Sequence, residues 1–124
     1  MPFTINWEEQ GSVTSYYGTV DISEVFETDR EFYNDPRSDS SKYRIIDFSQ
    51  ATPGFVDESL IEDIAAMDYG ASRSIPRLNV AFITKDSYIK GLCNQYIKLI
   101  IEMNIKWKCM IFEDMDSARK WTSS

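Results

Sequence analysis

The fold is decided by the stretch Tyr43–Met67, which reads YRIIDFSQATPGFVDESLIEDIAAM. The apolar run Tyr43–Phe48 predicts a buried strand, the Pro53-Gly54 pair predicts a turn, and a helix is expected to start near Asp57. In α/β proteins, a strand that leads directly into the start of a helix is where functional groups are usually placed. We therefore expect the most informative part of this protein to be the connection between this strand and this helix.

The segments on both sides of this stretch alternate between strand and helix patterns. Apolar and polar residues alternate in Phe3–Trp7 and in Val13–Tyr17, which predicts an antiparallel hairpin. Next come a helix capped by Asp21, with Glu24 at capping-box spacing, and the strand Tyr43–Phe48. A helix from Asp57 and the strand Leu78–Ile83 follow. The chain continues with a long helix whose apolar stripe extends from Ile89 to Met103, the strand Trp107–Phe112, and a short helix holding Ala118 and Trp121.

The order ββαβαβαβα predicts an α/β fold with a mixed, largely parallel sheet of about five strands flanked by helices. The three inner strands are continuous apolar runs, which indicates that both faces of the sheet are covered. We expect five of their side chains to be almost fully buried: Ile45, Ile46, Val80, Phe82 and Ile111.

Length and charge limit the classes of function. The 124 residues fit a single domain, 1–124, and 43% of them are hydrophobic, enough for a core. The net charge of −7 argues against binding to nucleic acid or to an anionic membrane surface, because both attract an excess of Lys and Arg. Four charged residues interrupt the most apolar region, residues 96–112, so no integral membrane segment is expected. The N-terminus does not resemble a signal peptide, and we expect a cytoplasmic protein.

The residues that usually perform catalysis are scarce. The sequence contains no histidine, and Cys93 and Cys109 lie in apolar patterns outside any CxxC motif. Its five glycines are scattered singly, without a phosphate-binding loop or a nucleophile motif. We therefore expect no enzymatic activity, no catalytic residue, no metal site and no cofactor.

The pattern IIDFSQATPGFVDESLIEDI resembles the core of STAS domains, the sulfate-transporter and anti-sigma-factor-antagonist domains typified by SpoIIAA. Those domains have an apolar strand ending in Asp-Leu-Ser and then Asp-Ser-Ser-Gly-Leu-Gly at a helix start. Here Ile45–Ser49 is similar to the strand and Phe55–Leu60 to the connection. The whole chain also resembles small bacterial SpoIIAA-like proteins of unknown role, through landmarks that include Trp7, Asp35-Pro36-Arg37, Ala118 and Trp121.

The resemblance implies a regulatory role for Ser59. In STAS antagonists a partner kinase phosphorylates the second serine of the motif, and Ser59 corresponds to it by position. Glu58 replaces the first serine, and Leu60-Ile61 replaces the Gly-Leu pair. The structural interpretation, in which Asp57, Glu58 and Ser59 only cap the helix N-terminus, is preferred because these residue types are common there.

The aromatic content suggests a different class of function. Seven Tyr, seven Phe and three Trp exceed what a small α/β core requires, and the fold is similar in architecture to lipid-carrying CRAL-TRIO domains. That resemblance implies an apolar groove between helices and sheet. The candidate ligand-pocket residues are Phe55, Leu60, Ile64, Tyr69, Tyr88 and Tyr96. The alternative is that these rings only fill the core. Arg73 and Arg77, which flank Ile75-Pro76, are candidates for binding an anion.

Together these features predict a non-catalytic binding module for a small lipophilic ligand or for a protein partner. The alternative is a STAS-type switch with Ser59 as the phospho-acceptor. A homodimer is compatible with either hypothesis.

Overall fold

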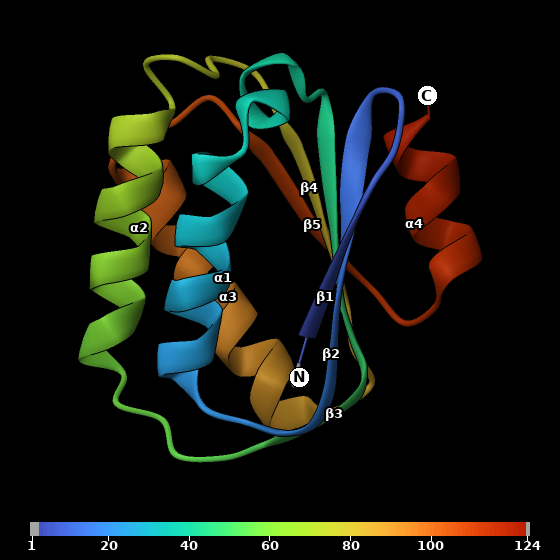
Figure 1. The fold of residues 1–124 in the computed structure, drawn as a ribbon. Coiled ribbons are helices and arrows are strands. Elements are labelled where there is room, and N and C mark those ends of the chain that lie inside the picture. Colours follow the sequence, from blue (N-terminus) through green and yellow to red (C-terminus); the bar gives the residue numbers. More distant parts are fainter. Residues whose placement is uncertain (1–2, 124) are drawn as a thin grey trace.

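The computed structural model describes residues 3–123 and consists of one sheet covered by helices on both faces (Figure 1). Its elements are β1 (Phe3–Trp7), β2 (Gly11–Val20), α1 (Ile22–Asn34), the 3-10 helix η1 (Pro36–Ser40), β3 (Tyr43–Pro53), α2 (Ser59–Ala71), β4 (Asn79–Ile83), α3 (Ser87–Glu102), β5 (Lys108–Phe112) and α4 (Met115–Thr122).

The five strands lie in the order β1-β2-β3-β4-β5. The pair β1–β2 is antiparallel, as predicted for a hairpin, and the three other pairs are parallel. Because each parallel step needs a crossover, the intervening segments carry the helices α1, α2 and α3. The predicted α/β class and the mixed, largely parallel sheet are therefore confirmed.

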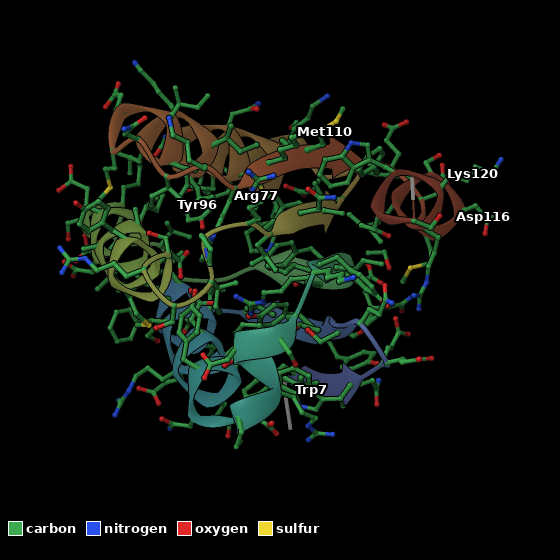
Figure 2. All side chains as sticks on the ribbon, turned by 90° about the horizontal axis from the view of Figure 1, so that it is seen from above. Trp7, Arg77, Tyr96, Met110, Asp116 and Lys120 are labelled. Carbon is green, nitrogen blue, oxygen red and sulfur yellow. The ribbon has the colours of Figure 1, made fainter. Side chains whose placement is uncertain are left out.

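The three crossover helices lie on one face of the sheet and α4 lies alone on the other (Figure 1). Side chains alternate along β3 accordingly: Ile46 and Phe48 pack with the helical layer, whereas Ile45 packs with Ala118 of α4. On the outer side of α4, Asp116 and Lys120 point away from the sheet (Figure 2). The larger core, and the space for a site, is on the face covered by α1–α3.

Burial follows the prediction in the inner strands and departs from it at the edge. Ile45, Ile46, Val80 and Phe82 are buried, as expected. Ile111 is only half-buried, so the expectation for this residue was wrong. The reason is its position on β5, an edge strand that pairs only with β4.

The strands β2 and β3 are longer than the sequence pattern suggested. They continue as a parallel pair through Tyr17↔Gln50 to Val20↔Pro53, past an irregularity in register between Ser15 and Tyr17. Gly18 has φ +71° within this extension, a conformation that glycine adopts without steric cost. The extended pair brings the start of α1 next to the connection between β3 and α2.

Candidate functional site

A cavity of about 100 Å³, partly open to solvent, lies between the sheet and the helices α1, α2 and α3. Most of its lining is apolar, contributed by Ile46 and Phe48 of the sheet and by Val25, Ile64 and Leu92 of the helices. Polar groups are confined to a few positions, of which Arg44, Asp29, Asp68 and Tyr96 belong to the interior. A mainly apolar space with a few convergent polar groups is the usual composition of a small-molecule site.

The two connections that precede α1 and α2 line one end of the cavity. Asp21, Ile22, Pro53 and Val56 line this end. Three hydrogen bonds join the two connections: Gly54 N–H donates to the Val20 carbonyl (2.9 Å), Phe55 N–H to the Asp21 carboxylate (2.8 Å), and Ile22 N–H to the Phe55 carbonyl (3.2 Å). These bonds hold the two connections against each other.

Gly54 is needed where the two connections touch. A Cβ atom at this position would come within 2.2 Å of the Asp21 carboxylate and 2.9 Å of the Thr19 methyl group. The Pro53-Gly54 turn predicted from the sequence therefore permits a close approach that another residue would block.

A buried ion pair stands at the other end of the cavity. Arg44 of β3 donates from Nη1 to Asp29 Oδ1 of α1 at 2.9 Å, and the two side chains are only 4% and 6% exposed. The guanidinium also lies 4.0 Å from the centre of the Phe32 ring. Burial acts against the charged form of Arg44, but Asp29, Tyr33 and Asp68 together outweigh it, so the pKa of Arg44 is raised.

Asp68 of α2 forms a second buried polar group beside this pair. Its carboxylate accepts hydrogen bonds from the Tyr33 hydroxyl of α1 (2.5 Å) and from the Tyr96 hydroxyl of α3. Tyr96 reaches from α3 into the space between the helices and the sheet (Figure 2). Burial, reinforced by the negative charge of Asp29, raises the pKa of Asp68 well above its ordinary value. One carboxyl group thus joins all three helices.

Within residues 3–123, four buried side-chain atoms have no hydrogen-bond partner: Ser12 Oγ, Thr14 Oγ1, Glu24 Oε2 and Arg44 Nε. Ser12 lies opposite Arg44 in the register of β2 and β3. Of the four residues, Arg44 alone lines the apolar cavity. Its Nε–H is a buried donor without a hydrogen-bond partner among the described residues.

The structure separates the six ligand-pocket residues predicted from the sequence. Ile64 and Tyr96 line the cavity. Phe55, Tyr69 and Tyr88 do not line it and are 73%, 43% and 47% exposed, so the expectation that they face this pocket is corrected. Their helix or loop positions point them outward, because the inward positions are taken by aliphatic residues such as Ile61 and Ile89.

Leu60 lies apart from this cavity, at the start of α2. It lines a different, more open hollow of about 320 Å³ together with Phe3 and Phe26. This hollow lies on the outer side of the contact between β1, α1 and α2, and it does not include the polar groups of the interior.

Ser59 is the first residue of α2 and is exposed, as expected. Its hydroxyl donates to Asp57 Oδ1 (2.7 Å), which also accepts from the Ser59 N–H (3.0 Å). Arg73 and Arg77 are both exposed, and Arg73 lies 5.7 Å from the centre of the Tyr69 ring. No contact in the part of the chain that the structure describes brings the two arginines together around a common site.

Asp29, Arg44 and Asp68 were not predicted as site residues, although the sequence contains a signal for Arg44 and for Asp68. Arg44 interrupts the apolar run Tyr43–Phe48, in which a charge must be paired if it is buried. Asp68 follows Ile61 and Ile64 at the spacing of a buried helix face. A charged residue at an inward-facing position of a predicted strand or helix is thus the sequence feature that indicates a buried polar site.

A polar hollow of about 320 Å³ at the carboxyl ends of β4 and β5, beside the middle of β3, includes Asp47, Asp86 and Asp114. All three carboxylates accept from nearby backbone N–H groups, those of Ser49, Ile89 and Ser117. Among residues 3–123 there is no group of three or more Asp, Glu, Cys or His side chains placed to hold a metal ion. Burial raises the pKa values of Cys93 and Cys109 to about 12, so both thiols stay protonated at neutral pH.

None of the helices in the described part of the chain is long and apolar enough to cross a membrane. Comparison with known proteins finds no match among family descriptions and none among curated proteins. Among solved structures, an uncharacterised protein of the DUF3478 family from Shewanella loihica PV-4, described as having a SpoIIAA-like fold, is similar with a TM-score of 0.58 at 11% sequence identity. The alignment covers 97% of this chain and 91% of that one. At this identity the likeness establishes the architecture, and the chain has a SpoIIAA-like fold.

Proposed function

We propose that this protein is a non-catalytic module that binds a small lipophilic ligand in the cavity between the sheet and α1–α3. The observation that supports this proposal is the cavity itself, whose lining between the Pro53–Val56 end and the polar groups around Arg44 is mostly apolar. Apolar cavities of this kind are filled favourably by apolar molecules, because the ligand leaves water and gains contacts that an empty space lacks.

The volume of the cavity limits the ligand. At about 100 Å³ it is smaller than the roughly 300–1,000 Å³ of ordinary ligand pockets and than the about 150 Å³ apolar cavity that admits benzene. A ligand must therefore be slender, or it must displace the connections that line the Pro53–Val56 end. The three hydrogen bonds at that end hold these connections, and one of them is accepted by Val20 at the end of β2.

Thermal unfolding with a panel of small apolar molecules tests this proposal, since a ligand that binds only the folded state raises Tm by mass action. Cys93→Leu adds side-chain volume at a residue that lines the cavity. Cys109→Leu is the matched control, because Cys109 is packed against the same core without lining the cavity.

Binding in the cavity predicts a ligand-dependent rise in Tm for the wild type and for Cys109→Leu, and a smaller rise for Cys93→Leu. Equal rises in all three proteins place the ligand elsewhere, and no rise for any member of the panel removes the proposal.

A regulatory switch at Ser59 is the alternative function. Its support is the exposure of the serine at the start of α2 in a SpoIIAA-like fold, where a kinase or another protein partner can reach it. The hydrogen bond from the Ser59 hydroxyl to Asp57 and the acidic surroundings favour the ligand-binding proposal.

A further inference from the structure

We propose that two copies of this chain associate through the free edge of β5, with the two β5 strands antiparallel across a twofold axis at Met110. This inference concerns a second surface and does not depend on the cavity. It rests on three features of the edge: backbone groups that point away from the sheet, an uncharged apolar centre, and charges of opposite sign at the two ends.

The first feature is the backbone of β5. The strand pairs only with β4, and the Lys108 N–H and the Phe112 carbonyl both make hydrogen bonds of 3.0 Å to the residues that flank β4. Because backbone groups alternate in direction along a strand, those of Cys109 and Ile111 point away from β4. The edge of β5 therefore presents donors and acceptors with which another strand can pair.

The second feature is the centre of the strand. Residues Cys109–Ile111 include no charge and no proline, which are the features that usually keep edge strands from pairing. Met110 is 45% exposed and lies at the border of the sheet opposite to Trp7 of β1 (Figure 2). At that other border, β1 exposes the polar residues Thr4 and Asn6. Among residues 3–123, β5 is thus the edge strand that exposes a large apolar side chain.

The third feature is the distribution of charge along the edge. Lys106 and Lys108 are exposed at the start of β5, and Glu113 and Asp114 are exposed directly after its end. When two such strands run antiparallel about Met110, Lys106 of one copy lies opposite Asp114 of the other, so the lysines meet acids at both ends. Each copy has a net charge of −7, which opposes association in general. The edge of β5 is a place where this repulsion is replaced by complementary charges.

The direction of the free backbone groups agrees with this register. Cys109 of one copy and Ile111 of the other both point outward, so they form a hydrogen-bonded pair, and the twofold axis repeats it. Met110 then lies opposite its own copy in a non-hydrogen-bonded pair, where Cα atoms are about 4.5 Å apart. Phe112, two residues further along β5, packs with Trp121, so the Met110 side chains cover each other on the face that carries α4.

The mass of the wild-type protein at increasing concentration tests the association. Light scattering or sedimentation should show a value that rises toward twice the 14.4 kDa of one chain. Met110→Lys should raise the Kd of the dimer at least about tenfold, because it places two like charges opposite each other. Tyr69→Lys is the matched control, since Tyr69 is 43% exposed and belongs to α2, away from β5 (Figure 1). Its Kd should equal that of the wild type.

Cysteine substitutions in a Cys109→Ala background test the register. In Met110→Cys the two new thiols face each other across the axis at a Cα separation that a disulfide can span, so mild oxidation should give a covalent dimer. In Lys108→Cys the two thiols are four positions apart along the strands, roughly 14 Å at about 3.4 Å per residue, and should not cross-link. Both positions are exposed, so random collisions would cross-link the two variants equally.

Hydrogen exchange of the wild type needs no substitution. The amides of Cys109 and Ile111 donate across the proposed interface, so their exchange should slow as the protein concentration rises. Amides of the inner strand β4 should exchange at rates that do not depend on concentration in the same range.

Each contrary result removes a defined part of the inference. A wild-type protein that stays monomeric at all concentrations would overturn the self-association and leave the β5 edge for a strand of a different protein. A dimer whose Kd is unchanged by Met110→Lys would place the interface on another surface. Equal cross-linking of Met110→Cys and Lys108→Cys would overturn the antiparallel register.

Discussion

The Asp21 carboxylate accepts a hydrogen bond from the backbone N–H of Phe55 at 2.8 Å, across 34 positions of the sequence. Asp21 precedes α1 and was expected to cap that helix, yet its side chain makes no capping hydrogen bond there. It instead holds the connection that leads from β3 to α2. The residue expected to start a helix thus lines one end of the apolar cavity and holds the connection there.

Asp21→Ala should loosen this end of the cavity. Removing the carboxylate leaves the Phe55 N–H without its acceptor and should lower the free energy of unfolding by about 0.5–2 kcal/mol, as for loss of a helix cap. Hydrogen exchange of the Phe55 amide should accelerate, and bound probes should dissociate faster.

Asp114→Ala is the control for this change. Asp114 accepts from the Ser117 N–H at 2.7 Å at the start of α4, on the opposite face of the sheet. The substitution Asp114→Ala should lower the free energy of unfolding by a similar amount and leave hydrogen exchange of the Phe55 amide unchanged. Equal exchange rates at Phe55 in wild type and Asp21→Ala would show that this hydrogen bond does not hold the connection.

Ile46→Ala should destabilise the protein by about 2–5 kcal/mol, because it removes a buried side chain that lines an existing cavity. The enlarged space should admit bulkier probes than the wild type does. Ile111→Ala on the edge strand β5 serves as the comparison and should cost less, since Ile111 is only half-buried. Chemical denaturation of both variants measures the difference.

The sequence predicted the strand and helix order because the apolar periodicity of each element is local. The runs around Ile45 and Val80 and the stripe from Ile89 are recognisable without any knowledge of their partners. Edge effects are not local: Ile111 has the same pattern as Val80, and only the order of the strands places β5 at the border.

The cavity could be predicted in general position but not in composition. Of the aromatic residues proposed to line it, Tyr96 does so, whereas Phe55 and Tyr88 are turned to solvent. The polar end depends on Arg44 and Asp68, which come from elements far apart in the sequence and meet only once the helices are packed on the sheet. Periodicity alone does not report such contacts.

Arg44→Met should destabilise the protein by about 3–5 kcal/mol, because it leaves the Asp29 carboxylate buried without a partner. Adding Asp29→Leu should recover most of this loss, since both charges are then absent. Urea denaturation of the two single variants and the double variant measures the coupling between the residues. Additive effects of the two substitutions on the free energy of unfolding would show that Arg44 and Asp29 do not stabilise the fold as a pair.

Asp68→Asn should change how stability depends on pH. Burial, together with the charge of Asp29, raises the pKa of Asp68 above the ordinary value of 3.8. Below that value the carboxyl is protonated in both states. As the pH rises toward the raised pKa, the unfolded chain releases its proton while the folded protein retains it, so the wild type loses stability. Asn does not titrate, and its stability relative to the wild type should increase across this range.

Each unit by which the pKa of Asp68 is raised corresponds to about 1.4 kcal/mol of this relative change. Asp57→Asn is an instructive comparison, because hydrogen bonds from Ser59 lower the pKa of Asp57. The stability of the wild type relative to Asp57→Asn should therefore decrease as the pH falls, whereas its stability relative to Asp68→Asn should decrease as the pH rises. Parallel pH profiles for wild type and Asp68→Asn would contradict the raised pKa of Asp68.

Ser59 should be unmodified in protein isolated from its native host. A phosphate adds a charge of about −1.5 to −2 beside the carboxylates of Asp57, Glu58, Glu62 and Asp63, and it replaces the hydroxyl hydrogen that Ser59 donates to Asp57. The N-terminus of α2 attracts a negative charge by only about 0.3–1 kcal/mol near a surface. The repulsion between the phosphate and the four nearby carboxylates is larger than this attraction. Phosphopeptide mapping checks this expectation, and stoichiometric phosphate on Ser59 would make the regulatory switch the preferred function. Ser59→Ala should leave the affinity for apolar probes unchanged, because Ser59 does not line the cavity.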